Sequence, residues 1–188
     1  MKRIGLFGGS FNPIHVGHLI LAEQARTFLR LDKVLFVPSY TTPFKKEELL
    51  EARHRYRMVR LAVRGNPHFE VSDIEIRRRG TSYTIDTVKV LKKRWPKAEF
   101  FFLIGSDCFQ TLTRWKEVEA LFRLCHFVIA KRPGFPLGAI PTGFRKLEIP
   151  QVDISSRTLR ERMCAGLSIA YQVPKAVEQY MLRHSLYR

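Results

Sequence analysis

The sequence predicts one α/β domain built on a doubly wound, mostly parallel sheet, with helices on both faces and a C-terminal helical segment. Short apolar runs typical of buried strands alternate along the chain with segments whose apolar residues recur at helical spacing. The most hydrophobic run, residues 100–104, is apolar throughout, as strands covered on both faces are. Of the 188 residues, 45% are hydrophobic, which suffices for one core over residues 1–188 without a linker or repeat.

The first elements predict a strand–helix–strand unit. Residues 4–7 are a short apolar run, and residues 19–31 carry apolar side chains at helical spacing. Residues 33–38 form a second apolar run, which ends at Pro38. A helix between two buried strands is typical of a parallel crossover.

The middle of the chain continues the alternation. A polar loop over 39–47 precedes a predicted helix at 48–63, which a Gly-Asn-Pro sequence ends. Residues 69–76 alternate between apolar and polar and predict a strand, with a break near Ser72 and Asp73 left open.

The remaining elements complete the sheet. A loop at 80–83 leads into a helix that Ser82 or Thr84 caps and that runs to about residue 95, before the strand at 100–104. In order, we then expect a helical stretch with Trp115, strands at 126–130 and 146–149, and helices at 157–165 and 174–184. Ligands bind such a Rossmann-like sheet at the carboxyl ends of its strands.

Composition and charge limit the classes of protein to which this chain can belong. The sequence contains no run of about 18 apolar residues, so it predicts no membrane span. It also shows no signal-peptide pattern, and we therefore expect a cytoplasmic protein without a membrane partner. Cys108, Cys125 and Cys164 are widely spaced and predict reduced thiols. The net charge of +16 suits a protein that handles polyanions. Its basic residues are scattered without an RNA-binding signature, so we expect mostly solvated charge and no nucleic-acid partner.

The glycine-rich segment at 8–18 carries the first functional signal. Gly8 and Gly9 follow the first strand, and His15 and His18 stand at the entrance of the predicted helix. Glycines let a backbone approach a phosphate closely, helix N-termini favour anions, and imidazoles donate to phosphate oxygens. The segment therefore predicts a nucleotide-phosphate site.

The residues of this segment do not by themselves exclude other roles than phosphate binding. The glycines match neither the G-x-G-x-x-G pattern nor the P-loop pattern. The two histidines could be half of a metal site, although helical zinc pairs stand at i and i+4 with a third ligand nearby. They could also only cap and pack the helix.

The sequence from Gly9 to His18 resembles the first signature of the nucleotidylyltransferases that share H/T-x-G-H with class I aminoacyl-tRNA synthetases. In this long form it is most similar to that of bacterial nicotinate mononucleotide adenylyltransferases. Those enzymes join nicotinate mononucleotide to the AMP part of ATP and release pyrophosphate. The resemblance implies catalytic roles for His15 and His18, which also contact ATP. It further implies ATP contacts from Gly8, Gly9, Ser10 and Phe11, and mononucleotide contacts from Ser10 and Asn12.

A second signature near the C-terminus agrees with the first. Residues 154–160 resemble the family's I-S-S-T-x-I-R segment, with Arg157 in place of the threonine. The resemblance implies that Arg160 is catalytic and that Ile154, Ser155, Ser156 and Arg160 contact ATP. An ordinary serine cap with a solvated arginine is the competing interpretation of this segment alone.

Two matches concern the nicotinate side of the site. Residues 81–87 resemble the family's T-Y-T-I-D-T segment, which implies that Tyr83 and Thr84 lie near the pyridine carboxylate. Trp115 matches a tryptophan that stacks on the nicotinate ring, for which an indole face is a rigid platform. Core packing of Tyr83 and Trp115, and a helix cap at Thr84, are the competing interpretations.

Two shorter matches concern ATP. The sequence Gly105-Ser106-Asp107 resembles the family's G-A-D and implies ATP contacts from Gly105 and Asp107, whose carboxylate can accept from ribose hydroxyls. Arg132 matches the arginine of an R-P-G turn that approaches ATP.

The weakest match covers residues 38–45, where the family has P-x-x-x-P-P-H-K. Thr42 replaces one proline and Phe44 replaces the histidine, whereas Lys45 is retained and is implied to contact the mononucleotide phosphate. A mobile surface lysine is the competing interpretation.

The resemblance runs from residue 4 to residue 160 with the motifs in family order. It implies ATP and nicotinate mononucleotide as substrates in NAD biosynthesis, and Mg²⁺ bound mainly through the ATP phosphates without a protein metal site. No general base is needed, because a phosphate monoester with a second pKa of about 6 is already ionised at neutral pH.

The nearest alternative is a related adenylyltransferase that uses nicotinamide mononucleotide or another phosphate acceptor. Phosphopantetheine is disfavoured by residues 81–87 and Trp115. A basic RNA-binding protein is the alternative from another functional class. The sequence leaves open whether the protein forms a homo-oligomer.

Overall fold

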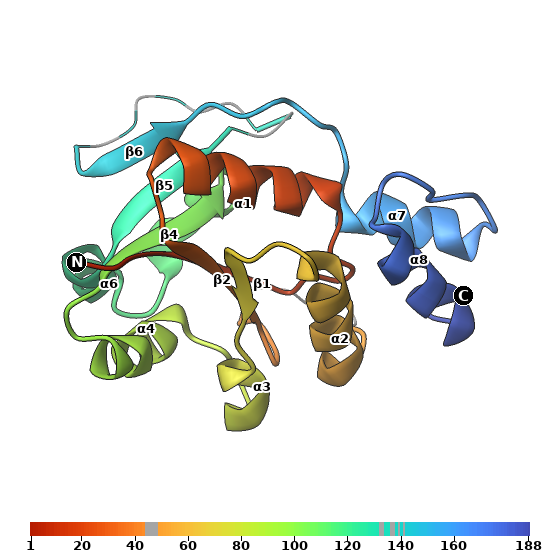
Figure 1. The fold of residues 1–188 in the computed structure, drawn as a ribbon, viewed down its shortest axis with the longest axis horizontal. Coiled ribbons are helices and arrows are strands. Elements are labelled where there is room, and N and C mark those ends of the chain that lie inside the picture. Colours follow the sequence, from red (N-terminus) through yellow and green to blue (C-terminus); the bar gives the residue numbers. More distant parts are fainter. Residues whose placement is uncertain (44–48, 132–133, 136–137, 139, 141) are drawn as a thin grey trace.

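The computed structural model describes residues 1–43, 49–131, 134, 135, 138, 140 and 142–188, and its described strands form a six-stranded sheet (Figure 1). The strand order is β3-β2-β1-β4-β5-β6, and every neighbouring pair is parallel. The doubly wound fold is thus confirmed. The strands are β1 (Arg3–Gly9), β2 (Lys33–Pro38), β3 (Phe69–Val71), β4 (Glu99–Gly105), β5 (His126–Ala130) and β6 (Phe144–Leu147). The order reverses between β1 and β4, which is where open α/β sheets bind ligands.

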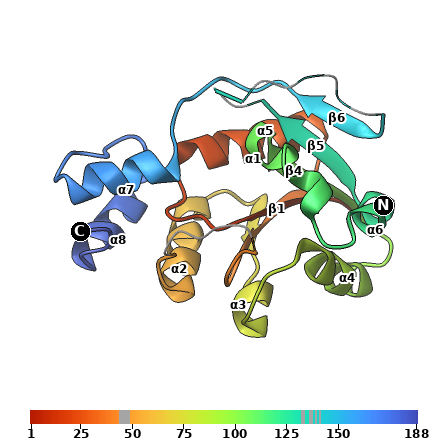
Figure 2. The same cartoon turned by 180° about the vertical axis from the view of Figure 1, so that it is seen from behind.

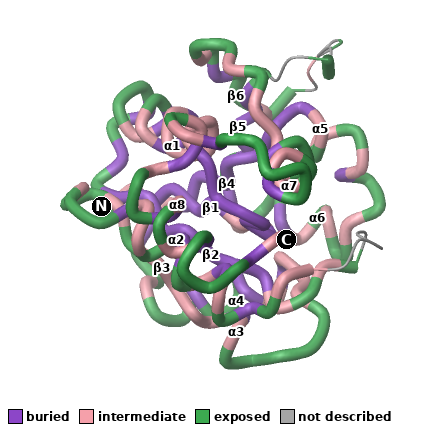
Figure 3. Tube along the Cα trace, turned by 90° about the vertical axis from the view of Figure 1, so that its right-hand side faces the viewer, coloured by how far each residue is buried: buried purple, intermediate pink, exposed green. Residues whose placement is uncertain are grey.

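Helices cover both faces of the sheet, as Figures 1 and 2 show from opposite sides. One core contains side chains of α1 (Val16–Phe28), α2 (Ala52–Val63), α7 (Ser156–Cys164) and α8 (Lys175–Arg183). The core on the other face contains side chains of α4 (Thr84–Arg94), the 3₁₀ turn η1 (Leu112–Arg114) and α6 (Val118–Leu124). The short helices α3 (Ile74–Arg78) and α5 (Ser106–Phe109) complete the described elements. Figure 3 shows the strands β1, β2, β4 and β5 as the mostly buried centre of this arrangement, whereas the edge strands β3 and β6 are only partly buried.

β1 is longer than its apolar run predicts. Gly8 and Gly9 belong to the strand, because they pair with the last residues of β2. The predicted glycine-rich turn therefore starts only at Ser10, and the two glycines form part of the sheet edge from which the site is built.

α1 begins and ends earlier than the predicted helix at 19–31. His15 has extended backbone angles (φ −144°, ψ 172°) and is the N-cap, so His18 lies in the first helical turn. Arg30 has a φ of 50°, in the left-handed region, which a continuing right-handed helix does not allow. The apolar spacing identified the buried residues Ala22, Ala25 and Leu29 but not the ends of the helix, and Phe28, which belongs to the same spacing, is exposed.

The predicted strand at 69–76 is wrong beyond Val71, because Ile74–Arg78 form the helix α3. The Glu75 side chain points inward, and its Oε1 accepts a hydrogen bond from the Thr87 hydroxyl at 2.6 Å. Asp73 pairs with Arg77 one turn later, at 3.0 Å. Alternation between apolar and polar residues indicates a strand only when the polar ones face solvent, and here the glutamate is buried.

Other boundaries also differ. α2 begins at Ala52 and not at residue 48, which lies outside the described residues. β6 covers Phe144–Leu147 and not 146–149. Trp115 lies in no helix, since it follows η1 with an extended backbone (φ −75°, ψ 141°). The other predicted strands and helices differ from the structure only at their ends.

Arg55 on the buried face of α2 connects three segments near the site. Its guanidinium is fully buried and donates to the carbonyl oxygens of Leu50, Ser10 and Tyr40, each at 2.7 Å. Burial lowers the pKa of this side chain, because the charged form loses hydration. Arg55 therefore holds the segments that follow β1 and β2 against the start of α2.

Candidate active site

Two cavities lie side by side at the carboxyl ends of β1 and β4. The first has a volume of about 370 Å³ and the second about 540 Å³, both within the range of small-molecule sites. We call the residues that line both cavities the shared wall. It consists of Phe7, Gly8, Gly9, Ser10, Gly105, Asp107 and Cys108. Ligands in the two cavities would meet at this wall.

The first cavity suits a flat ring that carries a negative charge. Tyr83, Thr84 and Trp115 line it, and the Trp115 ring packs edge-on against Phe102 at a centroid distance of 5.7 Å. Tyr83 is the N-cap of α4 and Thr84 its first residue, so the helix N-terminus borders the cavity. The N–H groups and the dipole at that end favour an anion.

Glu75 is a buried carboxyl in the first cavity that the sequence did not identify. It lines the cavity at 7% exposure, and burial raises its pKa, although the hydrogen bond from Thr87 acts in the opposite direction. Arg78 donates to the Thr87 hydroxyl at 3.0 Å and lies 4.0 Å from Glu75. These three side chains connect α3 to α4, and two of them, Glu75 and Thr87, line the cavity.

The second cavity is polar and cationic. His15, His18, Ser155, Ser156 and Arg160 line it, as do Phe11 and Ile154. Two further cations, Lys131 and Arg157, also lie in its lining. Such a set of donors fits a ligand with several phosphate groups.

His18 has a defined tautomer in its neutral form. Its Nδ1 lies 3.2 Å from the backbone nitrogen of His15, and a backbone N–H can only donate, so the ring proton belongs on Nε2. The two imidazoles stack with centroids 3.7 Å apart. A Cβ at Gly17 would lie 3.1 Å from His15 Nδ1, so a larger residue at this position would require the His15 ring to shift slightly. His18 therefore presents a donor on the ring edge away from the backbone.

The second signature is bonded directly to the first. Ser155 caps α7 by accepting from the Thr158 N–H at 3.0 Å, so the serine cap of the competing interpretation is present, while the ATP contact of Ser155 stays a prediction. The Ser156 hydroxyl donates to the Pro13 carbonyl at 2.8 Å, and Arg160 donates to the Asn12 carbonyl at 2.9 Å. The start of α7 and the segment after β1 thus form one side of the second cavity.

Asn12 differs from the other predicted site residues, because it is 2% exposed and lines neither cavity. Its Oδ1 accepts from the Tyr187 hydroxyl at 2.7 Å and from the Leu50 N–H at 3.4 Å. Its Nδ2 is buried without a hydrogen-bond partner among the described residues. The structure places Asn12 as an anchor between the segment after β1 and the C-terminus, and its contact with a mononucleotide stays a prediction.

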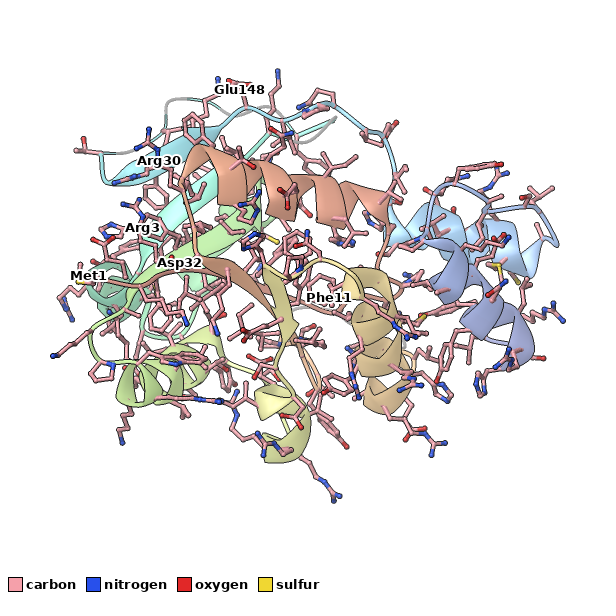
Figure 4. The ribbon with its side chains drawn as sticks, viewed as in Figure 1. Met1, Arg3, Phe11, Arg30, Asp32 and Glu148 are labelled. Atoms are coloured by element: carbon pink, nitrogen blue, oxygen red, sulfur yellow. The ribbon has the colours of Figure 1, made fainter. Side chains whose placement is uncertain are left out.

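Phe11 lies at the end of β1, between α1 and α2, whereas Arg3 and Asp32 lie at the opposite end of the sheet (Figure 4). Phe11 is buried with a φ of 45°, and its ring contacts the His18 ring edge-on at 5.2 Å. Phe11 therefore packs against His18 and lines the second cavity, and its predicted contact with ATP stays a prediction.

The predicted residues Lys45 and Arg132, and the replaced position Phe44, lie outside the described residues. Lining residues that the sequence did not indicate include Ser39, Thr42, Glu75, Cys108 and Lys131. Two of them, Ser39 and Lys131, follow a strand directly, which is the signal that could have identified them.

Neither a metal cluster nor a membrane span is found in the described part of the chain. No three histidine, cysteine or acidic side chains gather there as metal ligands. No helix there has the length and apolarity needed to cross a bilayer.

Comparisons with known proteins agree with this geometry. Residues 6–162 match the cytidylyltransferase-like family. The chain is 42% identical to a probable nicotinate-nucleotide adenylyltransferase of Bacillus pumilus, covering 100% of this chain and 99% of that one. It is 46% identical to the probable nicotinate-nucleotide adenylyltransferase of Thermus thermophilus, covering 99% and 100%. Its fold is similar to that of Plasmodium falciparum nicotinic acid mononucleotide adenylyltransferase complexed with NaAD. The TM-score is 0.85 at 22% identity, over 100% of this chain and 98% of that one.

Proposed function

The chain belongs to the cytidylyltransferase-like family, and from this premise we propose that it is a nicotinate-nucleotide adenylyltransferase. It transfers the AMP moiety of ATP to nicotinate mononucleotide, giving nicotinate adenine dinucleotide and pyrophosphate, in NAD biosynthesis. Relatives of similar length bear the name of this activity.

The observation that carries the proposal is the pair of cavities joined at the shared wall. The first has aromatic side chains and a helix N-terminus, which fits a pyridine ring with a carboxylate. The second has histidines, arginines and serines, which fits a triphosphate. A transfer between two nucleotides requires both sites in contact, as they are here.

The reaction needs positioning and charge stabilisation more than proton transfer. A phosphate oxygen of the mononucleotide attacks the α-phosphorus of ATP, a new O–P bond forms, and the bond from the α-phosphorus to the bridging oxygen breaks. Pyrophosphate leaves with that electron pair. The attacking phosphate is already ionised near neutral pH, since its second pKa is about 6. Holding the two groups in line and neutralising the developing charge are then the main contributions of the protein.

We assign these contributions to residues of the second cavity. His18 donates from Nε2 to a phosphate oxygen, and stacking on His15 fixes the plane of its ring. Arg160 supplies positive charge while its bond to Asn12 keeps α7 against the segment after β1. Asp107, in the shared wall, is placed to accept from a ribose hydroxyl.

A magnesium ion fits this set of residues when it is held mainly by the ATP phosphates. Magnesium retains several waters and binds substrate phosphates, so it does not require a dedicated set of protein ligands. The ion would neutralise phosphate charge. Magnesium use, a cytoplasmic location and the lack of a nucleic-acid partner stay predictions, and the oligomeric state stays open.

Pyrophosphate release with ATP and a panel of acceptors tests the proposal. Charged hydrogen bonds are stronger than neutral ones, and N–H donors cannot satisfy the NH₂ of an amide. We expect nicotinate mononucleotide to be preferred over nicotinamide mononucleotide by at least about tenfold in kcat/KM, a difference of about 1.4 kcal/mol. Equal use of both would support the broader alternative, a related adenylyltransferase. No release with any acceptor would contradict the enzyme assignment.

A further inference from the structure

Two buried hydroxyl groups in the first cavity have no hydrogen-bond partner within the described ranges. Ser39 is 5% exposed and follows β2 directly, and Thr42 lies further along the same loop. Both residues line the first cavity, and Ser39 Oγ and Thr42 Oγ1 are buried without a partner. A buried hydroxyl that makes no hydrogen bond destabilises a folded protein, so each such group requires an explanation.

The loop that carries these hydroxyls is otherwise well held. The Ser39 N–H donates to the Gly9 carbonyl at 2.9 Å, and the Tyr40 N–H donates to the Ser82 hydroxyl at 3.0 Å. The Tyr40 carbonyl accepts from Arg55 at 2.7 Å. The backbone around Ser39 is therefore fixed from several sides, so the missing partner of its hydroxyl is not the result of a loose segment.

The bond from Ser39 to Gly9 places this loop beside the shared wall. If the proposed function holds, the phosphate of the acceptor must reach that wall to attack ATP, and its ribose must follow directly behind. A hydroxyl can donate to a phosphate oxygen, and it can donate to or accept from a ribose hydroxyl.

We propose that Ser39 and Thr42 form hydrogen bonds to the ribose-phosphate part of the acceptor mononucleotide. The inference rests on the proposed function and adds two contacts that the motifs do not identify. Thr42 stands where the resembled motif has proline, which has no hydroxyl, so this contact belongs to the present chain. Neither hydroxyl has a partner among the described residues, and binding of the acceptor would supply one to each.

The substitutions Ser39→Ala and Thr42→Val test the proposal, because they remove a hydroxyl with little change of shape. Each should raise the Tm of the free protein, since an unsatisfied buried group is lost. Each should also weaken binding of nicotinate mononucleotide by roughly three- to tenfold, which corresponds to one hydrogen bond. Binding is measured by calorimetry without ATP, and Thr42→Ser, which keeps a hydroxyl, should restore it.

Thr41→Val is the matched control for stability. The Thr41 hydroxyl is partnered, since it donates to the Gly80 carbonyl at 2.9 Å, so its removal should not raise the Tm. A fall in Tm for Ser39→Ala and Thr42→Val would show that these hydroxyls have structural partners and would overturn the proposal. A raised Tm with unchanged mononucleotide binding would overturn it as well.

Nicotinate and nicotinamide mononucleotides share the ribose-phosphate part, so both should lose affinity by the same factor in each variant. A loss confined to one of them would place the contact at the ring and contradict the proposal. A wild-type protein that binds mononucleotide without releasing pyrophosphate would refute the proposed function but leave this inference intact. A protein that binds neither mononucleotide would refute both.

Discussion

His18 combines two hydrogen-bonding roles in one ring. Nδ1 accepts from the His15 backbone, which places the proton on Nε2 as a donor in the second cavity. His18→Asn keeps an acceptor close to the position of Nδ1 but has no donor at Nε2. We expect kcat to fall by a factor on the order of 10²–10³ in this variant, as for the loss of one charge-stabilising donor.

His18→Gln is the matched control, because its longer side chain carries an NH₂ group close to the position of Nε2. It should retain more of the turnover than His18→Asn does. Steady-state kinetics give kcat, and thermal unfolding shows whether each variant is folded. A folded His18→Asn protein with near wild-type turnover would remove His18 from the mechanism.

Glu75 makes stability depend on pH. Its pKa is raised on folding from the ordinary value of 4.5, because burial disfavours the charged form. The native state then binds this proton more tightly than the unfolded state does. The contribution of Glu75 to stability is therefore full below pH 4.5 and is lost as the pH rises through its native pKa.

Unfolding measurements on wild type and Glu75→Gln across this pH range check the sign. The stability of wild type relative to the variant should fall as the pH rises, because glutamine has no charge to bury. Glu119→Gln, at an exposed position of α6, should show no such trend. A constant difference between wild type and Glu75→Gln would indicate that the carboxyl titrates normally.

At the scale of elements, the segment after α8 reaches back to the loop after β1. The Tyr187 hydroxyl donates to Asn12 Oδ1 at 2.7 Å, and burial raises its pKa, so the phenol stays protonated. Tyr187→Phe leaves a buried acceptor weakly paired and should cost about 1–2 kcal/mol of stability. Because Asn12 also holds Arg160 through its carbonyl, we expect kcat to fall several-fold, with a smaller change in KM.

Tyr180→Phe provides the comparison within α8. The Tyr180 hydroxyl contacts His54 Nδ1 at 2.9 Å, and this pair joins α8 to α2 away from both cavities. Its loss should lower the Tm without lowering kcat. If the two variants affected kcat equally, Tyr187 would have only a structural role.

At the scale of the whole molecule, the net charge of +16 exceeds what two nucleotide substrates need. A positive field of this size raises the local concentration of anionic substrates, and salt screens it over about 10 Å at 0.1 M. We therefore expect kcat/KM to fall several-fold between low and high ionic strength while kcat changes less. Charge reversal at Arg57 and Arg64, exposed on and just after α2 and outside both cavities, should weaken this dependence.

The sequence by itself determined the order of the strands along the chain, and most of the site residues that it predicted line one of the two cavities. Apolar runs such as 33–38 and 100–104 predict strands because burial on both faces selects apolar side chains at every position. The signatures around His18 and Arg160 are local, since each is one short continuous segment that leads into a helix, and such segments can be identified without the fold. Both signatures line the second cavity in the structure.

The tertiary structure alone decided where polar side chains are buried. Arg55 and Glu75 have types that are ordinarily exposed, and only the packing of α2 and α3 turns them inward to partners distant in the chain. The role of Asn12 depends on Tyr187, at the opposite end of the sequence. The Ser39 and Thr42 hydroxyls differ from ordinary loop hydroxyls because folding buries them, and no described residue is their partner. Burial of a polar side chain and its hydrogen bonds depend on contacts between distant segments, so the residue pattern of one segment does not predict them.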